Sequence, residues 1–106
     1  MPGRVLLDEN IPVLLRHHLA GVEAASAEYM GWKGVRNGEL LRRAREGGFA
    51  VLLTADRALA LSLRVWAPLG CVYVSSNRID RLRPAADELG LACRDVLPGQ
   101  VVTVRV

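Results

Sequence analysis

The segment 49–54 contains an uninterrupted apolar run, Ala50-Val51-Leu52-Leu53, and this run constrains the fold more than any other feature. A continuous run of this length is typical of a strand that is covered on both faces, which occurs mainly in parallel sheets. Short, largely apolar runs at residues 4–7, 71–74 and 101–104 also indicate strands, and residues 22–25 form a weaker candidate strand. The sequence therefore predicts a mostly parallel central sheet of about five strands.

Helices are expected between these strands. Pro12 suits the first turn of a helix that runs to about Ala20 and stops at Gly21. Asn37 fits the N-cap of a helix over residues 38–46, which Gly47 and Gly48 end.

The segment 58–66 has leucines that alternate as in a strand, but it also has an apolar helical face. Its richness in Ala and Leu, and the need for a crossover between parallel strands, favour a helix. A last helix is expected to begin at Pro84. The alternating order of strands and helices predicts one α/β domain over residues 1–106, with helices on both faces of the sheet.

Composition narrows the class of protein further. A chain of 106 residues with 51% hydrophobic and 24% charged residues fits one globular domain. No apolar stretch reaches the ~18 residues of a membrane span, and the start of the chain does not resemble a signal peptide. Cys71 and Cys93 have no metal or redox spacing, so we expect buried free thiols in a reducing cytoplasm, with a disulfide as the alternative.

The basic residues are thirteen arginines and one lysine, Lys33. Because the arginine guanidinium fits phosphate oxygens, nucleic acid is a natural partner to consider. Solvated helix faces explain most of these arginines equally well.

Polar residues follow three of the predicted strands, as Asp8-Glu9-Asn10, Thr54-Ala55-Asp56 and Ser75-Ser76-Asn77. Ligands of open α/β sheets bind beyond the carboxyl ends of the strands, so these segments are the candidate site. Clustered carboxylates repel each other unless a cation lies between them. Hard oxygen ligands without a histidine or thiolate pattern suit Mg²⁺ or Mn²⁺.

Each acid also has a structural interpretation. Asp8 and Asp56 each precede a predicted helix and could simply cap it. Glu39 could complement the helix dipole and pair with Arg43 one turn later.

Four segments resemble a family of stand-alone PIN-like domains, relatives of the ribonucleases of VapC-type toxin–antitoxin pairs. They are LLDENIP at 6–12, MGWKG at 30–34, NGELL at 37–41 and LLTADR at 52–57. The match extends in order over about residues 4–78. The resemblance implies a PIN fold whose acids hold one or two Mg²⁺ or Mn²⁺ ions that activate water against an RNA phosphodiester.

Carried over by motif, Asp8 is the metal ligand of the first strand and Asp56 is the acid of the T-x-D element. Many relatives have an acid at the start of the following helix, at the position where this chain has Asn37. In this chain the acid lies two residues later, as Glu39. The full PIN set of four acids is not met. Around these acids we expect a supporting polar rim, and the nuclease hypothesis adds two arginines near the scissile phosphate. The rim residues are Asn10, Asn37, Thr54 and Asn77, and the arginines are Arg57 and Arg78.

The resulting hypothesis is a metal-dependent endoribonuclease in the cytoplasm, acting on RNA as the toxin of a toxin–antitoxin pair and inhibited by an antitoxin protein. The alternative is a PIN-like domain without catalysis that binds nucleic acid or protein. A phosphoacceptor receiver domain is disfavoured, because it needs a lysine near the last strand to hold the phosphoryl group. The single lysine of this chain, Lys33, is not near the last strand. An apolar face at Leu61 and Val65 would suit a homodimer contact.

Overall fold

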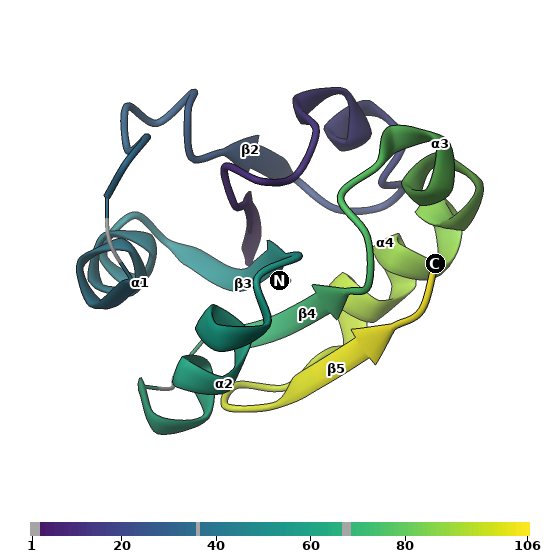
Figure 1. The fold of residues 1–106 in the computed structure, drawn as a ribbon. Coiled ribbons are helices and arrows are strands. Elements are labelled where there is room, and N and C mark those ends of the chain that lie inside the picture. Colours follow the sequence, from purple (N-terminus) through teal and green to yellow (C-terminus); the bar gives the residue numbers. More distant parts are fainter. Residues whose placement is uncertain (1–2, 36, 67–68) are drawn as a thin grey trace.

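The protein forms a five-stranded, wholly parallel sheet in the order β2-β1-β3-β4-β5 (Figure 1). The structure, a computed structural model, describes residues 3–35, 37–66 and 69–106, and for residues 37 and 62–66 it describes the backbone alone. The strands are β1 (Arg4–Leu7), β2 (Ala24–Ser26), β3 (Phe49–Thr54), β4 (Gly70–Val74) and β5 (Val101–Val104). The predicted α/β class and the predicted parallel sheet are confirmed.

Helices connect the strands. They are the 3-10 helix η1 (Val13–His17), α1 (Asn37–Glu46), α2 (Arg57–Trp66), α3 (Ile79–Leu82), the 3-10 helix η2 (Arg83–Ala85) and α4 (Ala86–Asp95). No described helix is long and apolar enough to cross a bilayer.

The sheet separates two hydrophobic cores because alternate strand residues point to opposite faces. In β1, Val5 and Leu7 pack with η1, α3 and α4, whereas Leu6 packs with α1 and α2. In β3, Leu53 packs in the same core as Val5 and Leu7, and Leu52 packs in the same core as Leu6. Helices therefore cover both faces, as the apolar strands predicted.

The connection from β4 to β5 differs in hand from that between β3 and β4. Both move in the same direction across the sheet, but α2 packs on one face and α4 on the other. Parallel crossovers are nearly always right-handed, so this pair of opposite hands is an unusual feature. Its consequence is that the helix joining β4 to β5 covers the opposite face of the edge strand β5 from α2.

Three predicted elements differ from the structure. The helix expected from Pro12 to Ala20 is the shorter 3-10 helix η1, in which only Leu15 is buried. A helix with so narrow a buried face gains little from packing, which is the main source of helix stability in proteins. The strand expected over residues 22–25 begins two residues later and ends one residue later, at Ala24–Ser26.

The last helical segment begins at Ile79, earlier than the predicted start at Pro84. Pro84 lies in η2, between α3 and α4. Proline has no N–H to donate and its ring clashes with the preceding turn, so it interrupts a helix that would otherwise continue. The proline marks a break inside the helical segment and not its beginning.

Both cysteines are buried and free, as predicted. Burial raises the pKa of Cys71 and of Cys93 to about 12, so both thiols stay protonated at neutral pH.

Candidate functional site

The candidate site lies at the carboxyl ends of β1 and β3, the two central strands at which the strand order reverses. From β1 the chain moves outward to β2 and then returns to β3 on the other side of β1. Such a switch point leaves a crevice at the carboxyl edge of the sheet, where open α/β folds bind ligands. Asp8 follows β1 and Thr54 ends β3.

Asp8 is the centre of a hydrogen-bond network. Its side chain is buried, with 5% of the residue surface exposed. Its Oδ1 accepts a bond from the Glu9 N–H at 2.9 Å, and its Oδ2 accepts one from the Thr54 hydroxyl at 2.7 Å and one from the Asn10 amide at 3.3 Å. Three donors from two chain segments therefore fix the orientation of this carboxylate.

Thr54 connects Asp8 and Asp56, the two aspartates predicted to be metal ligands. Its hydroxyl donates to Asp8 and accepts a bond from the Asp56 N–H at 2.9 Å. Asn10 strengthens the same connection, because its Oδ1 accepts a bond from the Ala55 N–H at 3.1 Å. The segments after β1 and β3 are thus joined by side chains that the sequence had placed on one rim.

Asp56 caps α2. Its Oδ1 accepts the Leu59 N–H at 3.2 Å, three residues into the helix, as an N-cap side chain does. Its Oδ2 has no hydrogen-bond partner among the residues that the structure describes. One carboxylate oxygen is therefore used by the helix and the other is open to a ligand.

The pKa of Asp8 is raised above its usual value of 3.8, and the largest cause is burial. The charges of Glu9 and Asp56 raise this pKa further, whereas the hydrogen bonds from Thr54 and from the Glu9 N–H lower it. A buried carboxylate near two other carboxylates is relieved of this cost when a cation binds. The electrostatics thus favour a cation at this rim.

Glu9 was not among the predicted site residues, and it lies beside the network. Its Oε2 accepts the Gly34 N–H at 2.9 Å. Gly34 has φ of +80°, a conformation that favours glycine, and Trp32 in the same loop packs edge-on against Phe49 with ring centroids 5.8 Å apart. The hydrogen bond from the Gly34 N–H to Glu9 explains why the loop that contains Trp32 and Gly34 lies next to the residues after β1.

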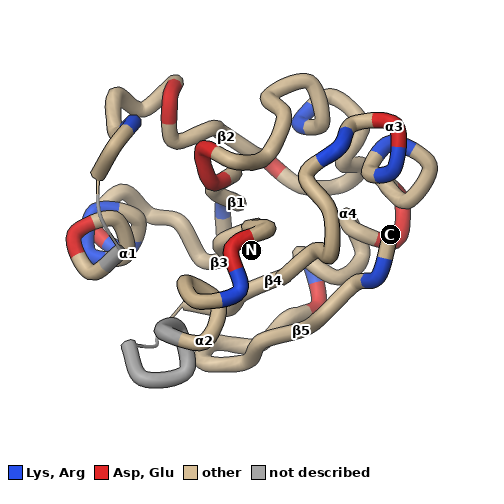
Figure 2. The backbone as a smooth tube through the Cα atoms, viewed as in Figure 1, with Lys and Arg blue, Asp and Glu red and all other residues tan. Residues whose placement is uncertain are grey.

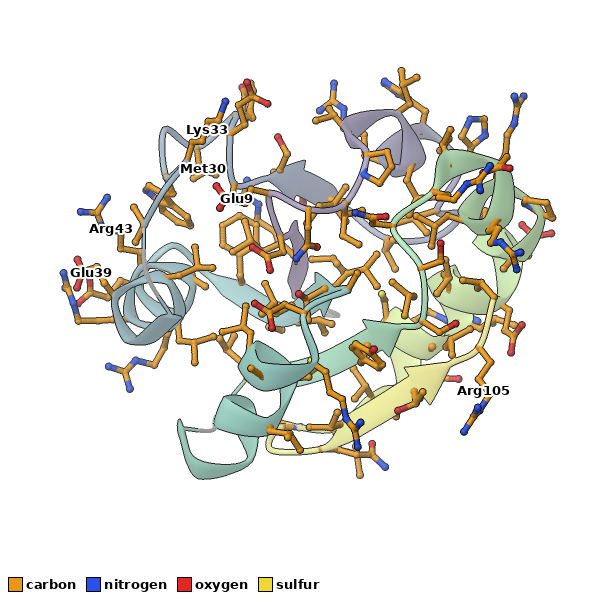
Figure 3. All side chains as sticks on the ribbon, viewed as in Figure 1. Glu9, Met30, Lys33, Glu39, Arg43 and Arg105 are labelled. Atoms are coloured by element: carbon orange, nitrogen blue, oxygen red, sulfur yellow. The ribbon has the colours of Figure 1, made fainter. Side chains whose placement is uncertain are left out.

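Glu39 lies elsewhere. Its side chain is 40% exposed, and its carboxylate forms ion pairs with Arg42 and with Arg43, the latter at 2.9 Å. These guanidinium groups lower the pKa of Glu39 to about 2. Figure 3 shows Glu39 and Arg43 together on the outer side of α1, away from Glu9. The structure therefore gives Glu39 the helix-surface pairing that the sequence offered as the alternative to a metal ligand.

The remaining predicted site residues do not all lie at the rim or in the described part of the chain. The side chain of Asn37 lies outside the described residues, as does that of Val65 in the expected dimer face. Asn77 is exposed and has no hydrogen bond to another described residue. Arg78 pairs with Asp80 at 2.9 Å, whereas Arg57 is exposed and follows Asp56 directly.

The described residues contain no group of three or more His, Cys, Asp or Glu side chains that could hold a metal ion. The three-acid cage of Asp8, Glu39 and Asp56 is therefore not assembled. Two carboxylates remain at the rim, and Mg²⁺ commonly binds through one or two carboxylates while keeping several waters and taking oxygens from a substrate phosphate. The donor set fits that kind of open site.

Figure 2 shows the charge arrangement: one acidic segment follows β1, another precedes α2, and a basic segment comes directly after the acidic segment that precedes α2.

Comparison with protein-family models, with curated proteins and with solved structures gave no match to this chain. The functional interpretation therefore depends on the geometry of the rim and on the sequence resemblance.

Proposed function

We propose that the protein is a Mg²⁺- or Mn²⁺-dependent ribonuclease that hydrolyses RNA phosphodiester bonds at the Asp8–Asp56 rim. The observation that carries this proposal is the buried Asp8 carboxylate, which Thr54 connects to the segment of Asp56 at the switch point of the sheet. These residues belong to LLDEN and T-x-D, two of the sequence elements that carry the resemblance to PIN-like domains.

Asp8 and Asp56 are the residues that would hold the ion. When bound, such an ion lowers the pKa of a coordinated water and neutralises charge on the phosphate. The protein's own residues supply orientation: Thr54 and the Glu9 N–H hold the Asp8 carboxylate in one position. Arg57, which follows Asp56 at the start of α2, provides a guanidinium for the phosphate of the RNA.

A toxin role in the cytoplasm, with an antitoxin protein as the inhibitor, is part of the same proposal. It depends on the resemblance to VapC-type relatives. Co-purification of a small partner that blocks RNA cleavage would support it.

The second candidate is a PIN-like domain that binds nucleic acid or protein without catalysis. The specific observation in its favour is the position of Glu39, whose carboxylate is paired with Arg42 and Arg43. Because Glu39 does not reach the rim, Asp8 and Asp56 are the two predicted ligands that the described residues bring together there, short of the four acids of the PIN set.

The test is RNA cleavage by the purified protein with Mn²⁺ or Mg²⁺, compared with Asp8→Asn. We expect metal-dependent cleavage by the wild type and none by Asp8→Asn, because the substitution removes a ligand charge. Asp87→Asn, which removes an exposed acid from the first turn of α4, is the matched control and should cleave as the wild type does. Circular dichroism and thermal melting establish that each variant is folded.

Absence of cleavage by the wild type with either ion would reject the ribonuclease and leave the binding module. Cleavage that survives in folded Asp8→Asn would show that the activity does not come from this rim.

A further inference from the structure

A groove of about 420 Å³ lies between α2 and the edge strand β5. Its polar lining residues come from the start of α2, from β4 and β5, and from the residues that follow these strands: Arg57, Tyr73, Ser75, Thr103 and Arg105. We call it the β5 groove. It is open because the helix that joins β4 to β5 packs on the opposite face of the sheet from α2.

The β5 groove continues the candidate site across the sheet. Thr54 is in register with Tyr73 on β4, and Tyr73 is in register with Thr103 on β5. These three side chains form one row, and the Thr54 hydroxyl at one end of it bonds to Asp8. The row spans two strand spacings, roughly 10 Å. A chain molecule bound at the rim would have to extend over only about this distance to reach the groove.

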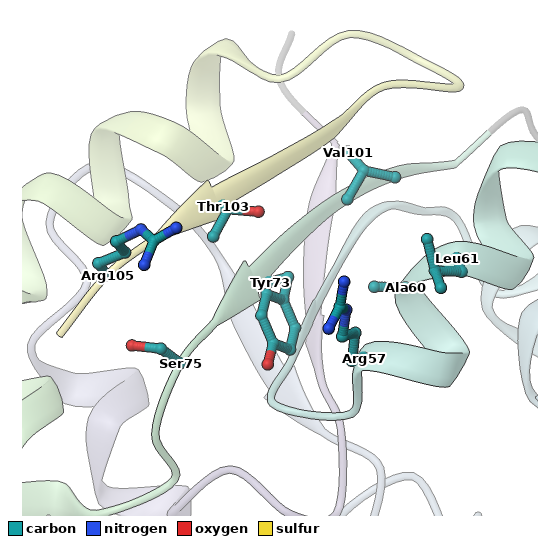
Figure 4. A pocket seen from close by; sticks show the side chains of 8 residues that line it. All are labelled: Arg57, Ala60, Leu61, Tyr73, Ser75, Val101, Thr103 and Arg105. Atoms are coloured by element: carbon teal, nitrogen blue, oxygen red, sulfur yellow. The ribbon is translucent and has the colours of Figure 1, made fainter.

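The lining of the groove is basic. It includes two guanidinium groups and no acidic side chain. Arg57 and Arg105 are both exposed, and neither forms an ion pair or a side-chain hydrogen bond with a described residue. Figure 4 shows Arg57 beside Tyr73, with Arg105 at the other end of the groove near Ser75. The two charges are thus free to bind anions.

The backbone on both sides of Arg105 is held by hydrogen bonds to Ser75. The Ser75 hydroxyl accepts the Val106 N–H at 2.9 Å, and the Ser75 N–H bonds to the Val104 carbonyl at 3.4 Å. These bonds keep residues 104–106 alongside the end of β4, so the Arg105 guanidinium projects from an ordered segment. An anchored cation loses less conformational entropy on binding than one on a free tail.

We propose that the β5 groove binds single-stranded RNA as it leaves the Asp8–Asp56 rim, with Arg57 and Arg105 on successive phosphates and an unpaired base against Tyr73. The inference rests on the proposed function, because it assumes that RNA occupies the rim. Aromatic faces accept any base, and arginines contact the backbone, so the groove contributes affinity without a strict sequence preference.

The test measures binding of a short labelled single-stranded RNA by fluorescence anisotropy, with EDTA present and at several salt concentrations. Each phosphate contact that is lost should reduce the slope of log affinity against log salt by roughly 0.7. We therefore expect Arg105→Gln to weaken binding and flatten this slope, and the double variant Arg57→Gln/Arg105→Gln to flatten it by roughly 1.4.

Tyr73→Leu should weaken binding by about fivefold or more and leave the slope unchanged, because stacking involves no counterion release. Arg45→Gln is the matched control. Arg45 is exposed and lies in the last turn of α1, which ends just before β3 begins, so it lies at the opposite edge of the sheet from the rim. This variant should bind RNA as the wild type does.

The RNA-binding role of the β5 groove is rejected if the wild type does not bind RNA or if Arg105→Gln retains wild-type affinity and slope. It is also rejected if Arg45→Gln loses as much affinity as Arg105→Gln. A base-paired duplex that binds better than the single strand would also contradict it. The proposed function has a separate readout, since nothing in it uses Arg105. Metal-dependent cleavage lost in Asp8→Asn, together with unaltered binding by Arg105→Gln, would retain the ribonuclease and reject the groove.

Discussion

Asp8 combines two properties that a purely structural residue does not need. It is a buried acid with three hydrogen-bond donors, and two further carboxylates act on its charge. A helix cap would be more stable if it were exposed and far from other acids. Burial and the neighbouring charges raise the pKa of Asp8, and acids with raised pKa values are common at functional sites.

This raised pKa has a measurable effect on how stability depends on pH. In the unfolded chain Asp8 titrates near its usual pKa of 3.8, and in the folded protein its pKa is higher, so the folded state binds more protons between the two values. The contribution of Asp8 to the free energy of unfolding should therefore fall as pH rises through this window, by at most about 1.4 kcal/mol per pH unit, and then level off.

Urea unfolding of the wild type and of Asp8→Asn from pH 4 to pH 7 measures this contribution. We expect the free energy of unfolding of the wild type, relative to that of Asp8→Asn, to decrease with rising pH. Curves that stay parallel over the whole range would show that Asp8 is not perturbed in the folded protein.

At the scale of elements, Asp56 shows how one side chain serves both a helix and a site. Its Oδ1 caps α2, and its Oδ2 accepts no hydrogen bond from another described residue. The sequence presented these roles as alternatives, and the geometry of the two oxygens makes them compatible.

Two substitutions separate the roles. Asp56→Asn keeps a capping oxygen and removes the charge, so its stability should match that of the wild type while Mn²⁺ binding is lost. Asp56→Ala removes both, and should lower the free energy of unfolding by about 0.5–2 kcal/mol. Urea unfolding and calorimetric titration with Mn²⁺ measure the two effects. Wild-type Mn²⁺ affinity in Asp56→Asn would contradict the ligand role, and equal destabilisation by both variants would contradict the cap.

The elements themselves were predicted to the extent that local patterns determine them. The apolar run in β3 and the need for a crossover at α2 indicated the correct type of element. Pro84 was misleading because a proline suits the first turn of a helix as well as a break between two helical segments. The helix expected after Pro12 was too long because its apolar residues do not all face the sheet.

At the scale of the whole molecule, the parallel sheet explains why part of the site was predictable. All carboxyl ends of parallel strands meet at one edge, so Asp8, Thr54 and Asp56 come together once the strand order is correct. Glu39 was not predictable in this way, because Arg42 and Arg43 lie one helical turn away and provide local ion-pair partners. The β5 groove depends on which face each crossover covers, and no local pattern in the sequence records that choice.

The most direct test of the central claim is a crystal of the protein soaked in Mn²⁺ and measured for anomalous scattering. The account predicts an anomalous peak between the carboxylates of Asp8 and Asp56, with Glu39 remaining on its arginines, and no peak there in crystals of Asp8→Asn. A wild-type crystal with no Mn²⁺ at this rim, or with Mn²⁺ bound only at other carboxylates, would contradict it.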